Sequence, residues 1–373
     1  MSRLAPRASL LTLARVVAAA AVLRRVAMAA RRGQPLGPAP LDAPLPTISI
    51  VVPARDEAAR IGPLLDALRD APGVAEVLVV DDESSDDTAA VATAAGARVL
   101  PGQALPAGWA GKAWALQQGL EAATGDWVVM LDADTRPSRD LPQALVARAL
   151  ADRIDLVSVG GRFECPTPGV AWLHPAMLTT LVYRFGPAGS TARMAPSRVL
   201  ANGQCMAAPR ERLLAAGGLS AVGGQVVEDV ALARHLAAQG WAVAMLDGAA
   251  LLSTRMFEDL GHTWRGWARS LALPGVEPLL RQVLDLAGLV LAQALPVLRL
   301  VARRADVVDF VLLVTRLGTL GGTAPAYALP RRAHRVAYAL SPLADPVAVT
   351  AVAVGVARPL LGRRHTWRGR TYG

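Results

Sequence analysis

Apolar and polar residues follow two alternating patterns through the middle of the chain. Short apolar runs that end in acidic or polar residues are typical of buried strands of a parallel sheet, and they occur at 47–57, 74–88, 97–102 and 125–135. Apolar residues at helical spacing occur at 58–71, 88–97 and 112–123. Because strand-like and helix-like stretches take turns, the pattern predicts an α/β fold with a doubly wound sheet and right-handed crossovers.

Two carboxylates stand at the end of the last of these strand-like runs. The apolar residues 128–131 lead directly into Asp132 and Asp134. Ligands bind beyond the carboxyl ends of strands in such sheets, and an extended chain would put both carboxylates on one side. Two like charges on one side repel each other unless a cation lies beside them. The pattern therefore favours a hard divalent metal, although a lone D-x-D is also typical of a solvated turn.

Long apolar segments flank the α/β pattern on both sides. The segment 9–23 is apolar apart from Arg15, and it favours an uncleaved membrane anchor over a cleaved signal peptide. Near the C-terminus, the segments 286–302, 310–329 and 339–362 each approach the ~20 residues that cross a bilayer. Arginine pairs follow nearly every apolar segment, so the positive-inside rule does not set the orientation.

These patterns divide the chain into five parts. We expect a membrane anchor at 1–32, a Pro-rich linker at 33–46, the α/β domain at 47–273, membrane helices at 280–362 and a basic tail at 363–373.

The net charge of +9 is distributed unevenly along this division. Residues 1–45 carry seven arginines and one acid, residues 281–373 carry thirteen basic and four acidic residues, and the middle carries 19 basic and 25 acidic residues. Basic flanks beside apolar segments fit an anionic membrane surface better than nucleic acid. Two cysteines are too few for a disulfide framework, which points to a reducing compartment. No Gly-rich loop follows the first strand, so dinucleotide and P-loop sites are unsupported.

Five motifs resemble, in order and approximate spacing, family 2 glycosyltransferases of the GT-A fold. They are ISIVVPARDEAARI, VLVVDDESSDDT, GWAGKAWALQQG, VVMLDADT and VEDVALARHL, and the resemblance covers roughly 47–273. Together with ANGQCMAAPRERLLAAGG and the C-terminal WRGRTY, they look most like membrane-bound enzymes of carotenoid or hopanoid pathways. The resemblance implies a GT-A mixed sheet and transfer of a hexose from a nucleotide sugar, with a UDP-sugar expected.

The resemblance also implies a donor site. Pro53 and Ala54 would line the nucleobase pocket and Asp82 would accept a hydrogen bond from the base, although Asp82 also suits a turn or helix cap. Lys112 is the only lysine in a chain with 39 basic residues, and it would offer a compact charge to a diphosphate. An exposed lysine at a helix start is the alternative. Asp134, with Asp132, would hold Mg²⁺ or Mn²⁺ against the diphosphate.

Acceptor activation is expected from Glu228 and Asp229, which stand at the start of a predicted helix. In the resembling family this pair contains the general base, usually the aspartate, and a single direct displacement inverts the anomeric centre. Helix capping is the alternative. Nearby, Trp264, Arg265 and Trp267 suit an interfacial helix, and the Q-x-x-R-W signature of processive relatives is missing.

Together these features predict a multi-pass enzyme of the cell membrane. Its catalytic domain would be cytoplasmic, and its acceptor would be a lipid or a lipid-linked hydroxyl compound. Two other classes stay open: a nucleotidyltransferase-like enzyme acting on a sugar phosphate, and a non-enzymatic membrane protein.

Overall fold

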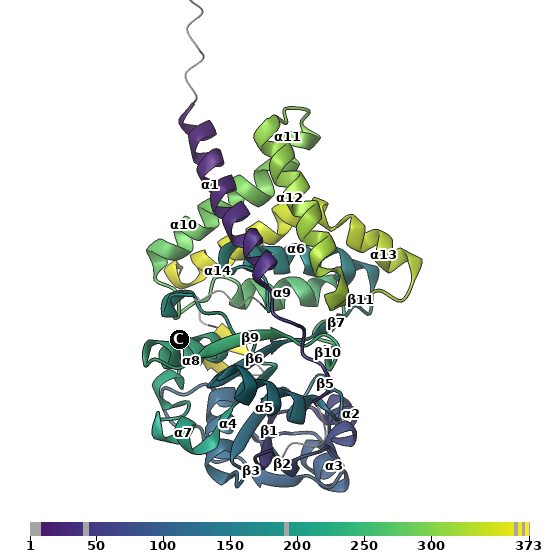
Figure 1. The fold of residues 1–373 in the computed structure, drawn as a ribbon, viewed down its shortest axis with the longest axis vertical. Helices are drawn as coiled ribbons and strands as arrows, with labels where there is room; N and C mark the ends of the chain where they lie inside the picture. Colours follow the sequence, from purple (N-terminus) through teal and green to yellow (C-terminus); the bar gives the residue numbers. More distant parts are fainter. Residues whose placement is uncertain (1–8, 40–44, 190–193, 362–364, 368–369, 373) are drawn as a thin grey trace, which may run out of the picture.

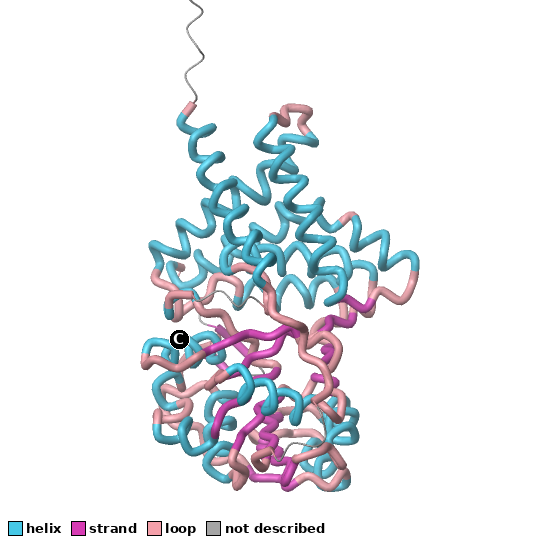
Figure 2. Tube along the Cα trace, in the orientation of Figure 1, coloured by secondary structure: helices cyan, strands magenta, loops and turns pink. Residues whose placement is uncertain are grey.

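The computed structural model describes residues 9–39, 45–189, 194–361, 365–367 and 370–372. An α/β domain lies at one end of its long axis and a layer of helices at the other (Figure 1). This helical layer consists of α1 (Leu10–Val26), α6 (Pro168–Phe185), α9 (Leu260–Ser270), α10 (Leu279–Leu289), α11 (Leu295–Val301), α12 (Val307–Thr323), α13 (Arg332–Ala339) and α14 (Asp345–Leu360). Figure 2 shows the separation, with the strands confined to the α/β end and to the boundary between the two parts.

The main sheet has seven strands in the order β3-β2-β1-β4-β8-β6-β9, and β8 runs antiparallel to both of its neighbours. Its strands are β1 (Ile48–Ala54), β2 (Val74–Asp81), β3 (Arg98–Pro101), β4 (Trp127–Leu131), β6 (Leu156–Gly160), β8 (Cys205–Pro209) and β9 (Val243–Asp247). The helices of this domain are α2 (Ala58–Leu68), α3 (Thr88–Ala94), α4 (Gly111–Ala122), α5 (Leu141–Asp152), α7 (Arg210–Ala215) and α8 (Glu228–Ala238). The predicted α/β mixed sheet is therefore confirmed.

Strand β1 is buried on both faces, as its unbroken apolar sequence requires. Ile50 and Val52 belong to the core on the side of α2, whereas Val51 belongs to the core on the side of α4. Helix α4 approaches the sheet closely because Gly119 has no side chain: a Cβ there would lie 2.3 Å from a methyl group of Val51. This packing fixes the start of α4 near the carboxyl end of β1.

A second, four-stranded sheet joins the α/β domain to the helical layer. Its order is β11-β7-β10-β5, with β5 (Thr135–Pro137), β7 (Arg162–Glu164), β10 (Leu252–Thr254) and β11 (Tyr327–Ala328). β5 begins directly after Asp134, and β11 belongs to the connection between α12 and α13. The helical layer thus supplies an edge strand to a sheet that begins beside the D-x-D sequence.

The helical layer differs from the expected arrangement in two ways. Helices α6 and α9 lie within 47–273 but pack among the C-terminal helices, so two helices of the expected α/β domain belong to the helical layer. Three helical stretches, Leu279–Val301, Val307–Ala326 and Ser341–Leu360, are long and apolar enough to cross a membrane. The N-terminal helix α1 has 17 residues and is not among them.

Some expected parts are only partly described. Residues 1–8 of the anchor, 40–44 of the linker and 362–364, 368–369 and 373 at the C-terminus lie outside the described residues. Within the expected basic tail, β12 (His365–Trp367) pairs antiparallel with β13 (Arg370–Tyr372).

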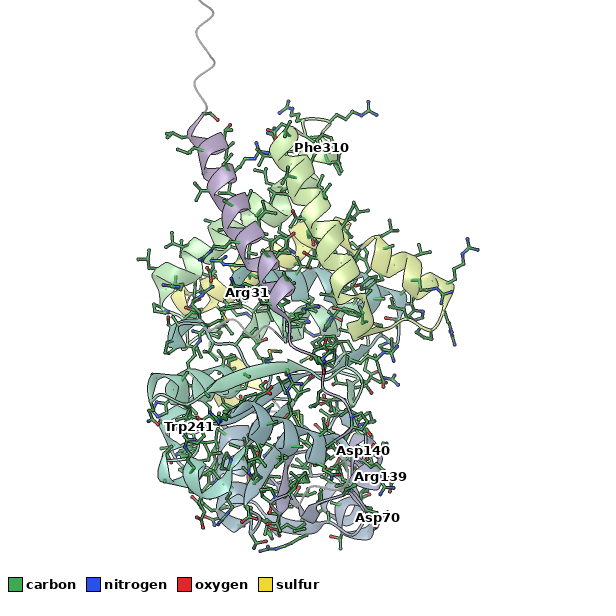
Figure 3. All side chains as sticks on the ribbon, viewed as in Figure 1. Arg31, Asp70, Arg139, Asp140, Trp241 and Phe310 are labelled. Atoms are coloured by element: carbon green, nitrogen blue, oxygen red, sulfur yellow. The ribbon has the colours of Figure 1, made fainter. Side chains whose placement is uncertain are left out.

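The surface of the helical layer is apolar. Among the described residues, Leu150 is the one exposed large hydrophobic residue of the α/β domain, and all the others lie on the helical layer and its connections. Phe310, on α12, lies near the far end of this layer, whereas Asp70, Arg139, Asp140 and Trp241 lie on the opposite, α/β part (Figure 3). A surface divided in this way is typical of a protein that is partly embedded in a membrane.

A buried ion cluster explains the charge inside α1. Arg15 donates to Asp306 at 2.7 and 2.8 Å and to Asp309 at 2.5 Å, and Arg299 donates to Asp309 at 2.8 Å. The Arg15 side chain is 2% exposed and that of Asp309 is fully buried. Two arginines and two aspartates therefore neutralise one another and join α1, α11 and α12.

Replacing Arg15 should test this cluster. Arg15→Ala would leave Asp309 buried with one partner fewer, and breaking a buried pair costs about 3–5 kcal/mol. We expect a clear fall in the thermal unfolding midpoint of the detergent-solubilised protein. Arg24→Ala removes an exposed arginine from the same helix and should change the midpoint little. Equal midpoints for the two variants would contradict a stabilising role for the cluster.

Candidate active site

One large cavity lies between the α/β domain and the helical layer. Its volume is about 880 Å³, and its walls are the carboxyl-terminal ends of strands β1, β2 and β4 on one side and α9 and α14 on the other. Most of the residues expected to form the site line it: Pro53, Ala54, Asp82, Lys112, Asp132, Asp134, Glu228, Arg265 and Trp267. Asp229 and Trp264 are not among the lining residues.

The ends of β1 and β2 form the first part of this wall. The Asp82 amide donates to the Ala54 carbonyl at 2.8 Å, and the Arg55 guanidinium donates to the Asp82 carbonyl at 2.7 Å. Asp82 is buried. Since α3 begins at Thr88, Asp82 does not cap that helix, and a role toward a ligand in the cavity is the better interpretation.

Lys112 stands at the centre of the site. It lies in the first turn of α4, and its Nζ contacts Asp132 Oδ1 at 2.7 Å and Glu228 Oε1 at 2.9 Å. Burial opposes its charge, but the carboxylates of Asp132, Glu228 and Asp229 raise the pKa of Lys112 well above its ordinary value. Lys112 is therefore a fixed positive charge in the cavity rather than an exposed lysine at a helix start.

Asp132 and Asp134 lie in a turn, so the expectation of an extended chain at this point was wrong. β4 ends at Leu131, and the Thr135 amide donates back to the Asp132 carbonyl at 3.1 Å. Both aspartates nevertheless line the cavity. Burial raises the pKa of Asp132 to about 7, and the neighbouring Asp134 adds to the shift while Lys112 opposes it. A divalent cation would relieve this repulsion.

The surroundings of the two aspartates fit a metal that is bound jointly with a ligand. The described part of the chain contains no cluster of three or more His, Cys, Asp or Glu side chains suited to holding an ion. Mg²⁺ is commonly held by one or two carboxylates together with substrate phosphates and water. Asp132 and Asp134 supply those carboxylates, so a phosphate-bearing ligand would complete the coordination.

The acidic pair at the start of α8 divides into two roles. Glu228 lines the cavity and pairs with Lys112. The Asp229 carboxylate accepts hydrogen bonds from the Gly203 amide at 2.6 Å and from the Val230 amide at 2.8 Å. Burial and the neighbouring Glu228 raise the pKa of Asp229 to about 6. Asp229 is thus a positioned carboxylate with raised basicity, held just behind the wall that Glu228 forms.

The opposite wall comes from the helical layer. Arg265, Trp267 and Arg269 of α9 line it. The Trp267 ring lies 5.3 Å from that of His174, in an aromatic cluster below the wall, and Trp264 packs against the apolar core of the layer.

Sequence reasoning missed several lining residues: Arg55, Glu57, Arg60, Phe257, His262, Arg269 and Arg358. His262 and Arg269 stand on the same helix as Arg265, so helical spacing could have identified them. Arg358 is distant in sequence and reaches the cavity only through the packing of α14 on α9.

Comparison with known proteins agrees with this arrangement. Residues 49–213 match the model of "Glycosyl transferase family 2". The 4,4'-diaponeurosporenoate glycosyltransferase of Staphylococcus aureus is 28% identical over 234 residues, which cover 60% of each chain. The glucosyl-3-phosphoglycerate synthase of Mycolicibacterium paratuberculosis is 45% identical over 93 residues, 24% of this chain and 28% of that protein.

One solved structure shares the fold over nearly the whole chain. It is a mannosyltransferase from Pyrobaculum calidifontis in complex with GDP-Man and Mn²⁺, 22% identical, with a TM-score of 0.56. The likeness covers 94% of this chain and 97% of that one, so it includes the helical layer as well as the α/β domain.

The metal assignment can be tested directly. Asp134→Ala should abolish Mn²⁺-dependent binding of a nucleoside diphosphate, because the remaining carboxylate, Asp132, is already paired with Lys112. Isothermal titration calorimetry with UDP and with GDP, with and without Mn²⁺, would measure this. Asp70→Ala, at the far end of the α/β domain, is the matched control (Figure 3). Unchanged Mn²⁺-dependent binding by the folded Asp134 variant would exclude Asp134 as a metal ligand.

Proposed function

We propose that this chain, which belongs to glycosyl transferase family 2 through residues 49–213, moves a hexose from a nucleotide sugar to an acceptor at a membrane surface. The observation that carries the proposal is the convergence of Asp82, Lys112, Asp132 and Asp134 on one cavity that faces an apolar helical layer. A nucleotidyltransferase would need a glycine-rich basic loop after β1, and the sequence there is ARDEAARIG.

The donor would lie along the wall of the α/β domain. Pro53 and Ala54 would contact the nucleobase, and Asp82 would accept a hydrogen bond from it. Lys112 would face the diphosphate. Its positive charge would stabilise the negative charge that develops on the departing nucleotide more than it stabilises the intact donor. When bound, Mg²⁺ or Mn²⁺ at Asp134 and Asp132 would neutralise charge on the diphosphate. We propose a UDP-sugar as the donor, and a GDP-sugar is the comparison to make.

Asp229 would be the base that receives the acceptor proton. The backbone amides of Gly203 and Val230 orient its carboxylate, and its raised pKa brings it closer to the value that suits a base near neutral pH. Glu228 is instead paired with the Lys112 ammonium at 2.9 Å, which ties its carboxylate to the donor side of the cavity. As the acceptor oxygen attacks the anomeric carbon, its proton would pass to Asp229 and the bond to the diphosphate would break, with inversion.

The acceptor we propose is a lipid or a lipid-linked hydroxyl compound. The apolar helical layer forms one wall of the cavity, so a lipid could reach the donor without leaving the membrane. The name of the Staphylococcus aureus relative, a glycosyltransferase for a carotenoid acid, supports a polyene acceptor. We further propose that α1 anchors the N-terminus and that the α/β domain faces the cytoplasm of a multi-pass protein of the cell membrane.

The base can be tested with an isosteric pair of variants. Asp229→Asn keeps the shape and loses the proton-accepting group, so kcat should fall roughly 100-fold or more. Donor binding should change little, because Lys112 pairs with Asp132 and Glu228 and not with Asp229. Glu228→Gln is the comparison, and it should weaken donor binding by releasing Lys112. Near-normal turnover of Asp229→Asn would move the role of base elsewhere.

The pH profile should report the same carboxylate. The pKa of Asp229 is raised to about 6, so the basic form predominates above that pH and is lost as the pH falls through it. We expect kcat to be flat above about pH 7 and to fall about tenfold per unit at low pH, with the bend near 6. The residual activity of Asp229→Asn should lack this bend. A wild-type profile that is flat down to pH 4.5 would contradict the assignment.

Product analysis would test the function as a whole. Protein reconstituted in membranes would be given radiolabelled UDP- and GDP-sugars with a lipid extract of its host, and label would be followed into the organic phase. We expect Mn²⁺- or Mg²⁺-dependent incorporation into an organic-soluble product. Label found only in water-soluble glycosides would exclude the lipid acceptor, and no transfer from any donor would exclude the glycosyltransferase assignment.

A further inference from the structure

The two walls of the cavity differ in charge. Its five acidic lining residues all come from the α/β domain: Glu57, Asp82, Asp132, Asp134 and Glu228. The wall from α9 and α14 contributes Arg265, Arg269 and Arg358 and no acid. The wall that faces the membrane side is therefore cationic, although an apolar lipid tail needs no charge there.

Arg358 reaches this wall because α14 lies unusually close to α9. A Cβ at Gly355 would lie 2.9 Å from the Ala272 Cβ and 3.1 Å from the Ala268 carbonyl oxygen. Residues three apart share one face of a helix, so Arg358 points along the same side of α14 as Gly355. The close contact at Gly355 thus brings a side chain from near the chain's C-terminal end to the active-site cavity.

Arg358 differs from the other arginines buried or half-buried in the helical layer. Arg15, Arg184, Arg299 and Arg316 each pair with an aspartate, and Arg25 donates to the Tyr183 carbonyl at 2.8 Å. Arg269 also has an interaction partner. Within the part of the chain that the structure describes, Arg358 makes no hydrogen bond or ion pair with any side chain. Its guanidinium is thus available to an anion inside the cavity.

The position of Arg358 indicates which anion it would bind. The donor diphosphate would meet Lys112 and the aspartate-bound cation on the opposite wall. Arg358 stands instead at the end of the candidate span Ser341–Leu360, beside the exposed Leu360 and Leu361, where a lipid would enter. We propose that Arg358 binds a carboxylate or phosphate carried by the lipid acceptor. This inference rests on the proposed function, and it narrows the acceptor to an acidic lipid that arginine can hold through two hydrogen bonds.

Retinoic acid and retinol are suitable probes, because they share one polyene skeleton and differ in the terminal acid. Binding to the full-length protein in neutral detergent can be followed by quenching of tryptophan fluorescence, since Trp267 lines the cavity. We expect wild-type protein to bind the acid about tenfold more tightly than the alcohol, as a charge-assisted contact implies. Arg358→Gln should lose that preference while its affinities for retinol and for UDP with Mn²⁺ stay within twofold.

Two further variants complete the test. Arg358→Lys keeps the charge and should retain most of the preference for the acid. Arg332→Gln removes an exposed arginine from α13, outside the cavity, and should behave as wild type. Inorganic phosphate at 10 mM should not displace retinoic acid if the site binds an anion attached to a lipid. The polyene would add contacts that free phosphate cannot make.

Three results would overturn the inference. The first is that wild-type protein binds acid and alcohol with equal affinity, and the second is that phosphate displaces retinoic acid. The third is that Arg358→Gln weakens the binding of UDP with Mn²⁺ and leaves the binding of retinoic acid unchanged. A loss of all ligands in both the Gln and Lys variants would overturn it too, because Arg358 would then serve folding. Failure of the proposed function looks different, since wild-type protein would not bind UDP or GDP with Mn²⁺ at all.

Discussion

The ion pairs of Lys112 hold the active site together. One ammonium group contacts Asp132, in the turn after β4, and Glu228, at the start of α8, while itself lying on α4. These three segments are far apart in the sequence, and two of the three groups are acids that would repel each other without the lysine. The carboxylates of Asp132, Glu228 and Asp229 all act on the single positive charge of Lys112. Acidic groups therefore outnumber the lysine at this point of the site. That excess is the electrostatic basis of the proposal that a divalent cation binds here together with a diphosphate.

Ion pairs also join separate elements in the helical layer, where they connect one helix to another. Arg15 with Asp309, and Arg316 with Asp345, are buried among apolar helices, and the partly exposed Asp306 also pairs with Arg15. Such pairs contribute less to stability than well-packed apolar residues would, but breaking one is costly, so they specify which helices meet. A few polar contacts therefore help to hold the layer in one arrangement, while its exposed large hydrophobic residues lie on the outside.

The sequence predicted the first four strands of the main sheet, β1 to β4, because each is a short apolar run between polar turns. Strands β6, β8 and β9 were not predicted. Most of the residues proposed to bind the donor follow strands β1, β2 and β4, whose carboxyl ends meet at one edge of the sheet, so their convergence on one cavity could be predicted. The place of α6 in the helical layer was missed, because an apolar helix between β7 and β8 has the same sequence pattern as a helix of an α/β domain. Arg358 could not be identified from the sequence as a cavity residue. Its position depends on the close approach of Gly355 to α9, and no pattern in the sequence around Arg358 indicates that approach. The sequence could not predict that Glu228 lines the cavity while Asp229 accepts from backbone amides, because this depends on the directions of two neighbouring side chains.

The small sheet has a consequence for how such a protein can be divided. Its edge strand β11, Tyr327–Ala328, comes from the connection between α12 and α13, and its opposite edge, β5, starts right after Asp134. Helix α6 leaves the α/β domain in mid-sequence and is buried among the same helices. A fragment cut near residue 273 would therefore expose a sheet edge and the apolar face of α6, and it would lose Arg358, which α14 contributes to the cavity wall. The α/β domain and the helical layer share a sheet and a core, so a boundary placed between them at any one point in the sequence cuts through both.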